Sequence, residues 1–181
     1  MRKASITDTL IGLIVFFFIL GIAFPQLKQL FWLSGMDIQN KEWWRLVTVS
    51  LTHQGLFHMG FNVLSLHILG TPTESLLGKR NYFLVLFISL VSGSILSVIF
   101  NNPSVASVGA SGMIFGLFGS LALIGQRVGI EWRSILVIVG INFAIGFVLG
   151  GVDWRGHLGG LIGGTLVTII FKQISHSPRR Y

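Results

Sequence analysis

Apolar residues form long stretches in this chain, and short segments between them hold most of the charged residues. A helix needs about 20 apolar residues to cross the hydrocarbon core of a bilayer. The pattern predicts six membrane-spanning helices, at residues 9–24, 56–77, 82–100, 111–125, 134–150 and 157–171. The fourth and sixth are short and rich in glycine, so we expect them to lie within the bundle.

Composition also indicates a lipid environment. Of the 181 residues, 52% are hydrophobic and 10% are charged, whereas soluble domains carry roughly 25% charged residues. A soluble domain of this length could not bury so many apolar side chains, because small domains leave much of their surface in water. The chain has no cysteine, which excludes disulfides, thiol nucleophiles and thiolate metal sites. No shift in composition marks a second domain, so residues 1–181 are interpreted as one all-α membrane domain.

The basic residues predict how the chain is oriented. With the N-terminus in the cytoplasm, nine Lys and Arg lie on the inner side and four on the outer side. The inner residues are Arg2, Lys3, Lys79, Arg80, Arg127, Arg133, Lys172, Arg179 and Arg180, and the outer ones are Lys28, Lys41, Arg45 and Arg155. Positive charge accumulates on the cytoplasmic side of membrane proteins, so we expect both termini there. The net charge of +7 is spread among these segments, which does not resemble a nucleic-acid-binding surface.

The first outer segment, residues 25–55, is long and contains Trp32, Trp43 and Trp44 beside charged residues. Tryptophan prefers the interface between lipid and water. We therefore expect this segment to lie partly in the outer leaflet, with an ordinary interfacial loop as the alternative.

Two sets of polar residues in the spans are candidates for function, because ionisable groups are costly inside a membrane. His58 and Asn62 are four residues apart and share one face of the second helix. They could stabilise an oxyanion or pair with other helices. Ser111 opens the fourth helix within Gly109-Ala110-Ser111-Gly112, where unpaired N–H groups and the helix dipole favour negative charge. The alternative is that this serine caps a helix built for close packing.

His157 opens the sixth helix, and both this helix and the fourth have glycines four residues apart. The pairs are Gly112 with Gly116 and Gly160 with Gly164. Such glycines let helices approach closely, which would bring Ser111 and His157 within hydrogen-bond reach as nucleophile and base. Asp153 could orient His157 as a third member.

Together these residues resemble the rhomboid family of intramembrane serine proteases. The matching positions, in the family's order and spacing, are Trp44-Arg45, His53, His58, Asn62, Glu74, Gly78, Gly109-Ala110-Ser111-Gly112, His157, Gly160 and Gly164. They cover nearly the whole chain after the first helix. The resemblance implies a six-helix rhomboid fold with a membrane-embedded first loop and a water-filled cavity open to the outer face.

The resemblance also implies the roles of the polar residues. Ser111 is expected to be the nucleophile and His157 the general base, in a dyad that leaves Asp153 as a possible helper. His58, Asn62 and the backbone N–H of Ser111 are expected to form the oxyanion hole.

Further residues are expected to support the site. Phe115 is expected one turn below the serine, packed against the catalytic histidine. Trp44 and Arg45 would belong to the embedded first loop, with His53 supporting it. Glu74 could cap its helix or pair locally with Lys79 or Arg80. The supporting glycines are Gly109, Gly112, Gly160 and Gly164.

The implied activity is cleavage of the transmembrane segments of membrane proteins, with lipid as the other contact. The substrate helix is expected to enter past the fifth span, near Phe143 and Phe147. No nucleotide-binding motif or metal cluster is present, and His-Glu-x-x-His is absent, so no cofactor, metal or nucleic acid is expected.

The sequence leaves two alternatives to a protease open. One is a catalytically silent rhomboid-like protein that binds membrane clients, although such relatives usually lose the serine or the histidine. The other is a small transporter, although the halves of the chain show no inverted repeat. Short loops favour a minimal bacterial protein of the plasma membrane, and no feature indicates an oligomeric state.

Overall fold

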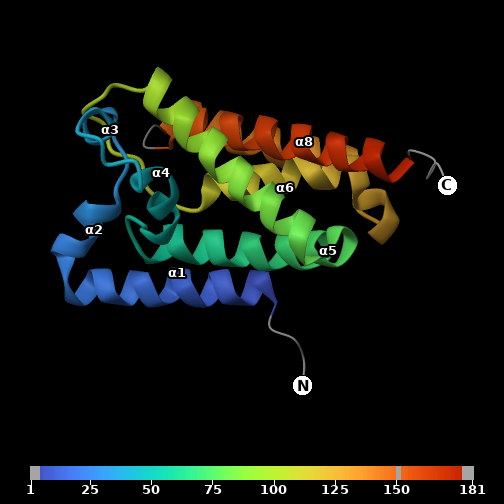
Figure 1. Ribbon diagram of the computed structural model, residues 1–181, viewed down its shortest axis with the longest axis horizontal. Helices are drawn as coiled ribbons and strands as arrows, with labels where there is room; N and C mark the ends of the chain where they lie inside the picture. Colours follow the sequence, from blue (N-terminus) through green and yellow to red (C-terminus); the bar gives the residue numbers. More distant parts are fainter. Residues whose placement is uncertain (1–4, 150–151, 177–181) are drawn as a thin grey trace.

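The computed structural model describes residues 5–149 and 152–176, with only the backbone described at residues 149 and 174–176. Its helices are α1 (Ile6–Ala23), α2 (Pro25–Phe31), α3 (Gly35–Gln39), α4 (Arg45–Thr48), η1 (Val49–Leu51), α5 (Leu56–Phe100), α6 (Ser111–Ile124), η2 (Gly125–Val128), α7 (Trp132–Leu149) and α8 (Trp154–His176) (Figure 1). Gly150, the expected end of the fifth span, and the basic residues Arg2, Lys3, Arg179 and Arg180 lie outside the described residues.

Helix α5 contains the second and third predicted spans. Its 45 residues would measure about 68 Å as a straight helix, more than twice the roughly 30 Å hydrocarbon core. The helix breaks at Gly78, where φ is 73° and ψ is 160°, a conformation that glycine adopts without steric cost. In Figure 1 the first half of α5 runs beside α1 and the second half crosses the bundle in another direction.

The observed helices extend beyond several predicted bounds. Helix α8 begins at Trp154, so His157 lies in its first turn instead of opening it, and the helix continues to His176. Among the described residues, three helical segments are long and apolar enough to cross a membrane by themselves: Ile6–Ala23, Leu56–Phe100 and Ser111–Val128. A shorter apolar helix covers Trp132–Val148. The chain therefore has the polytopic, all-α membrane architecture that the hydropathy pattern predicts.

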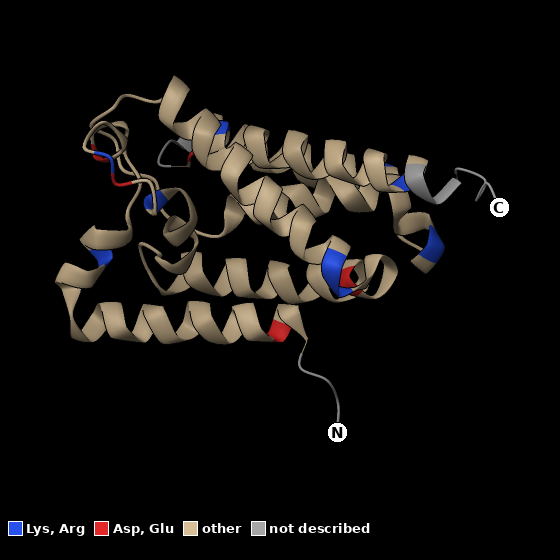
Figure 2. Ribbon diagram, viewed as in Figure 1, with Lys and Arg blue, Asp and Glu red and all other residues tan. Residues whose placement is uncertain are grey.

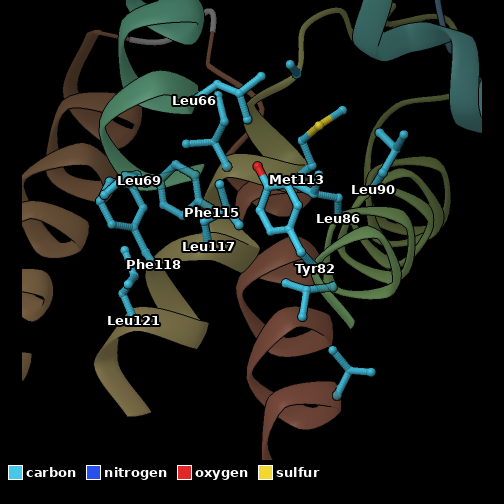
Figure 3. Packing of buried hydrophobic residues seen from close by; sticks show 14 of the residues in the cluster. Leu66, Leu69, Tyr82, Leu86, Leu90, Met113, Phe115, Leu117, Phe118 and Leu121 are labelled. Atoms are coloured by element: carbon cyan, nitrogen blue, oxygen red, sulfur yellow. The ribbon is translucent and has the colours of Figure 1, made fainter. Parts of the chain in front are cut away.

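The centre of the bundle is formed by α5, α6 and α8, with α1 packed on α5 and α7 packed mainly on α6. Fully buried side chains, including Leu66, Tyr82, Leu117 and Leu121, fill the space between these helices (Figure 3). Many large apolar side chains on α1, α5 and α7 are exposed, as expected for helices that face lipid. The described charged residues lie in the loops, near the helix ends and beside the break of α5 at Gly78 (Figure 2).

The start of α1 is attached to α5 by Glu74. Its carboxylate accepts hydrogen bonds from the Ser5 hydroxyl at 2.8 Å, the Ile6 N–H at 2.9 Å and the Thr7 N–H at 3.0 Å. The Thr7 hydroxyl also donates to it at 2.8 Å and lies 2.9 Å from the Tyr82 hydroxyl. The first N–H groups of a helix have no partner within the helix, so this carboxylate satisfies two of them and joins the two segments.

We expect Glu74→Ala to destabilise the bundle. Loss of a charged acceptor with four donors should lower the free energy of unfolding by about 2–4 kcal/mol, measured by thermal unfolding in detergent. Glu74→Gln should fall between this variant and the wild type, because its amide oxygen can still accept. The matched control is Ser75→Ala, whose side chain is exposed on the same helix. Equal melting temperatures for Glu74→Ala and the control would contradict the assigned role.

Candidate active site

Helices α6 and α8 are in backbone contact along their glycine faces. A Cβ atom added to Gly160 would overlap the carbonyl group of Gly112, and one added to Gly164 would overlap the backbone of Gly116. No side chain lies between the two helices at these positions. The glycine pairs identified in the sequence therefore face each other, and the helices approach as closely as their main chains allow.

This contact brings Ser111 and His157 to the same end of two touching helices. Ser111 is the first residue of α6 and is half-buried, and His157 is in the first turn of α8 with 7% of its surface exposed. Among the described residues, no hydrogen bond joins the Ser111 hydroxyl to the His157 ring, and the Nδ1 atom of His157 has no partner.

Aromatic side chains hold the His157 ring in place. The Phe115 ring stacks on it, with centroids 4.0 Å apart and planes 13° apart. Phe143 of α7 approaches the same histidine edge-on at 6.4 Å and Phe115 at 5.5 Å. The imidazole therefore lies between α6 and α7 with its plane set by Phe115.

His58 reaches the loop that leads into α6. Gly109 has a φ of 113°, and a Cβ atom there would lie 2.9 Å from Cε1 and Nε2 of His58. Glycine is thus required at this position both for its backbone conformation and for the space that the imidazole occupies. The His58 ring lies beside the backbone two residues before Ser111.

Asn62 lies one turn after His58 on α5. Its Nδ2 donates to the His58 carbonyl at 2.8 Å, and its buried Oδ1 has no partner in the described part of the chain. An amide nitrogen carries two hydrogens, so one N–H of Asn62 remains available to another acceptor.

Asp153 is occupied by partners other than His157. One of its carboxylate oxygens accepts from the Ser107 hydroxyl at 2.6 Å, and the other accepts from the Gly156 N–H at 3.1 Å. Because the Nδ1 atom of His157 has no partner within residues 5–149 and 152–176, the carboxylate–histidine hydrogen bond of a triad is not formed in this structure.

His53 lies behind His58, with the two ring centroids 5.0 Å apart and the planes 68° apart. The side chain is only 1% exposed, and neither ring nitrogen has a hydrogen-bond partner among the residues that the structure describes. Burial, and to a lesser extent the neighbouring His58, lowers the pKa of His53 to about 3. His53 is therefore neutral at pH 7 and packs against His58 as an uncharged ring.

Arg45 organises the segment between α1 and α5. Its guanidinium donates to the carbonyl oxygens of Gln29 and of Trp32, the latter at 2.8 Å, and pairs with the Glu42 carboxylate at 2.5 Å. The Arg45 side chain is buried, whereas the Trp44 side chain is 52% exposed. The positive charge thus holds three parts of the segment together while the indole points outward.

A contact that the sequence does not predict joins this first segment to the loop before α6. Leu33 and Ser107 exchange two backbone hydrogen bonds, of 3.1 and 2.7 Å, as an isolated antiparallel bridge. The Gly109 N–H donates to the Val49 carbonyl at 3.0 Å, and the Ser107 hydroxyl lies 2.8 Å from that of Ser97. Backbone pairing of two residues leaves no side-chain pattern, so no sequence signal could have revealed it.

A small cavity of about 30 Å³ lies beside Ser111. Its lining includes Ser97, Ser107, Gly112, Asp153 and Gly156. A polar space of this size can hold a water molecule. Within the described part of the chain, no group of three or more His, Asp or Glu side chains is placed to hold a metal ion.

Apolar helices joined by glycine contacts define this chain as a polytopic membrane protein, and comparison with known proteins gives the family. Residues 40–174, most of the chain, match the rhomboid domain model. Rhomboid protease GluP of Bacillus subtilis (strain 168) is 39% identical over 132 residues, which are 70% of this chain and 26% of GluP. YdcA of the same strain is 34% identical over 155 residues, 81% of this chain and 75% of YdcA. The chain thus spans about a quarter of GluP and three quarters of YdcA.

Similarity extends to plants, where RHOMBOID-like protein 1 of Arabidopsis thaliana is 36% identical over 147 residues, 76% of this chain and 36% of that protein. The chain belongs to the rhomboid family, a family of intramembrane serine proteases. It is an integral membrane protein.

We expect Gly160→Ala to disrupt the contact between α6 and α8. Its Cβ would meet the main chain of Gly112, so the helices must separate, at a cost of about 1–3 kcal/mol in the free energy of unfolding. Thermal unfolding in detergent measures the loss. The control is Gly140→Ala on α7, where an added Cβ meets no atom within 4 Å. If Gly160→Ala unfolds at the same temperature as this control, the helices are not limited by their backbones.

Proposed function

We propose that this chain is an intramembrane serine endopeptidase that cleaves transmembrane segments of membrane proteins, with Ser111 and His157 as its catalytic dyad. The observation that carries the proposal is the glycine contact, because it places the first residue of α6 and the first turn of α8 side by side. Membership of the rhomboid family supports the same reaction. Because the proposed site lies in a bundle of membrane-spanning helices, a transmembrane segment is the substrate that can reach it.

In the proposed reaction the Ser111 oxygen attacks the scissile carbonyl carbon while a ring nitrogen of neutral His157 accepts the hydroxyl proton. The tetrahedral intermediate collapses, the C–N bond breaks, and the imidazolium gives its proton to the leaving amine. Water then attacks the ester while His157 again accepts a proton. The C–O bond to Ser111 breaks, the imidazolium returns its proton to the serine oxygen, and the acid product leaves. The small cavity beside Ser111 has room for a water molecule near the ester.

The oxyanion of the intermediate requires donors close to Ser111. The first backbone N–H groups of α6 have no acceptor within the helix and point toward this end. His58 lies beside Gly109, and the second N–H of Asn62 is free to donate. We propose that these side chains and the Ser111 N–H form the oxyanion hole, with Phe115 holding the ring of His157.

A substrate helix must unwind before it is cut, because helical carbonyl groups are already hydrogen-bonded and shielded. We propose that it enters beside α7, which packs mainly on α6. Phe143 of this helix contacts His157, and Phe147 is 63% exposed. Segments with small residues at the cut and helix-weakening residues beyond it fit this route.

The proposed location is the bacterial plasma membrane with both termini in the cytoplasm, supported by the nine-to-four distribution of basic residues. In that orientation the Ser111 end of the bundle opens toward the outer face. The reaction as proposed uses no cofactor.

Replacement of the dyad tests the proposal directly. We expect Ser111→Ala and His157→Ala each to lower kcat by at least about 1000-fold, because the two residues act as one unit. The assay is cleavage of a single-span model substrate by purified protein in liposomes. Ser104→Ala and His67→Ala, both at exposed positions, are the matched controls and should cleave like the wild type. Binding of the substrate without cleavage by the wild type would instead indicate a silent client-binding protein.

The oxyanion hole gives a second, graded prediction. His58→Ala and Asn62→Ala should each lower kcat by about 10- to 1000-fold, the range for loss of an oxyanion donor, with KM little changed. Both are measured in the same liposome assay. An unchanged kcat in both variants would show that these side chains do not form the oxyanion hole. It would not contradict the proposed dyad.

A further inference from the structure

We propose that Asp153 is a positioning residue, which fixes Ser111 relative to His157 by joining the loop before α6 to the first turn of α8 through Ser107. The inference rests on the proposed function, because the positions that it fixes are those of the dyad. It assigns Asp153 a role that does not require contact with His157.

The carboxylate bridges two segments that are 46 residues apart in the sequence. One oxygen accepts from the Ser107 hydroxyl at 2.6 Å, a short distance typical of a strong hydrogen bond to a charged group. The other oxygen accepts from the Gly156 N–H at 3.1 Å and so caps α8 in the turn that holds His157. The Asp153 side chain thus binds both the loop before α6 and the first turn of α8.

Ser107 connects this bridge to the rest of the Ser111 end. Its hydroxyl lies 2.8 Å from the Ser97 hydroxyl on α5, and its backbone pairs with Leu33 in both directions. Ser107 is buried and precedes Ser111 by four residues. Asp153 therefore binds the central residue, Ser107, of a hydrogen-bond network. This network joins α5, the first loop, the loop before α6 and α8.

The network adds a restraint at the Ser111 end of the contact between α6 and α8. The facing glycines set the distance between the two helices, and the hydroxyls of Ser120 and Thr168, 2.7 Å apart, join the helices toward their other end. The Asp153 bridge restrains sliding and rotation of the helices beside the dyad. Because the bridge lies next to the dyad, a small shift there changes the distance between the Ser111 oxygen and the His157 ring directly.

A variant that removes the charge of Asp153 but keeps its hydrogen bonds can separate a positioning role from an electrostatic one. Both carboxylate oxygens are directed to Ser107 and Gly156, and Nδ1 of His157 has no partner. Asparagine can replace these contacts: its oxygen accepts from the Gly156 N–H, and its amide donates to the Ser107 oxygen. The Ser107 hydroxyl then donates to Ser97, because a hydroxyl is both donor and acceptor. Geometry, not charge, is what the bridge needs.

The test compares Asp153→Asn, Asp153→Ala and Ser107→Ala in the liposome cleavage assay, with Ser104→Ala as the control from the same loop. We expect Asp153→Asn to stay within about threefold of the wild-type kcat. Asp153→Ala and Ser107→Ala should lower kcat by about 10- to 100-fold, the cost of a misplacement of about 1 Å, with KM unchanged. A combined Asp153→Ala and Ser107→Ala variant should lose no more than the single variants, because both remove the same bridge.

Hydrogen–deuterium exchange supplies a readout that does not depend on cleavage. Asp153→Ala should accelerate exchange together in residues 105–114 and 154–160, whereas Asp153→Asn should leave both segments protected. If Asp153→Asn is as inactive as Asp153→Ala, the carboxylate acts through its charge and the positioning role is wrong. Wild-type kcat and exchange in Asp153→Ala would also overturn it. If wild type and Ser111→Ala are equally inactive, the proposed protease function fails, and the exchange data alone decide whether the bridge exists.

Discussion

Close approach of α6 and α8 is the constraint on which the remaining features of the site depend. In a bilayer the hydrophobic effect does not drive helices together, so association relies on van der Waals contact, hydrogen bonds and small residues at the interface. Here a single Cβ at Gly160 or Gly164 would meet the main chain of the facing helix. Because Ser111 and His157 lie at one end of this interface, every added ångström between the helices separates them by a similar amount.

Charged side chains secure the ends of a bundle whose middle is held by apolar packing. Glu74 attaches the start of α1 to α5, Arg45 collects the carbonyl groups of the first loop, and Asp153 joins the α6 approach to α8. Glu74 and Asp153 each bind groups from another segment, whereas Arg45 binds carbonyl groups within its own loop. All three lie near a bundle end, where a charge costs less than at the bilayer centre. Charged residues are costly inside a membrane. Here they occur where their hydrogen bonds join parts of the chain that are separated in the sequence.

The sequence could predict those features that repeat along a helix or fill a membrane thickness. Apolar runs indicated the spanning helices, and glycines four apart indicated which faces of α6 and α8 could meet. The sequence could not predict the partners of Glu74, which lie 67 to 69 residues away. It also could not predict the backbone bridge between Leu33 and Ser107. Asp153 was ambiguous for a physical reason: a carboxylate four residues before a histidine can cap the helix or orient the ring, and only the fold decides which.

Buried side-chain nitrogen and oxygen atoms without a hydrogen-bond partner are confined to one region of the described chain. The buried side-chain atoms without a partner there are both ring nitrogens of His53, Oδ1 of Asn62 and Nδ1 of His157. Elsewhere in the helices, buried hydroxyls such as those of Thr73 and Ser89 donate to carbonyl groups one turn earlier. Leaving a buried polar atom unpaired costs about 1–3 kcal/mol. The unpaired atoms gathered around Ser111 therefore lower the stability of this region. In the proposed reaction, the polar backbone of an unwound substrate binds in this region, and atoms without partners could form hydrogen bonds to it.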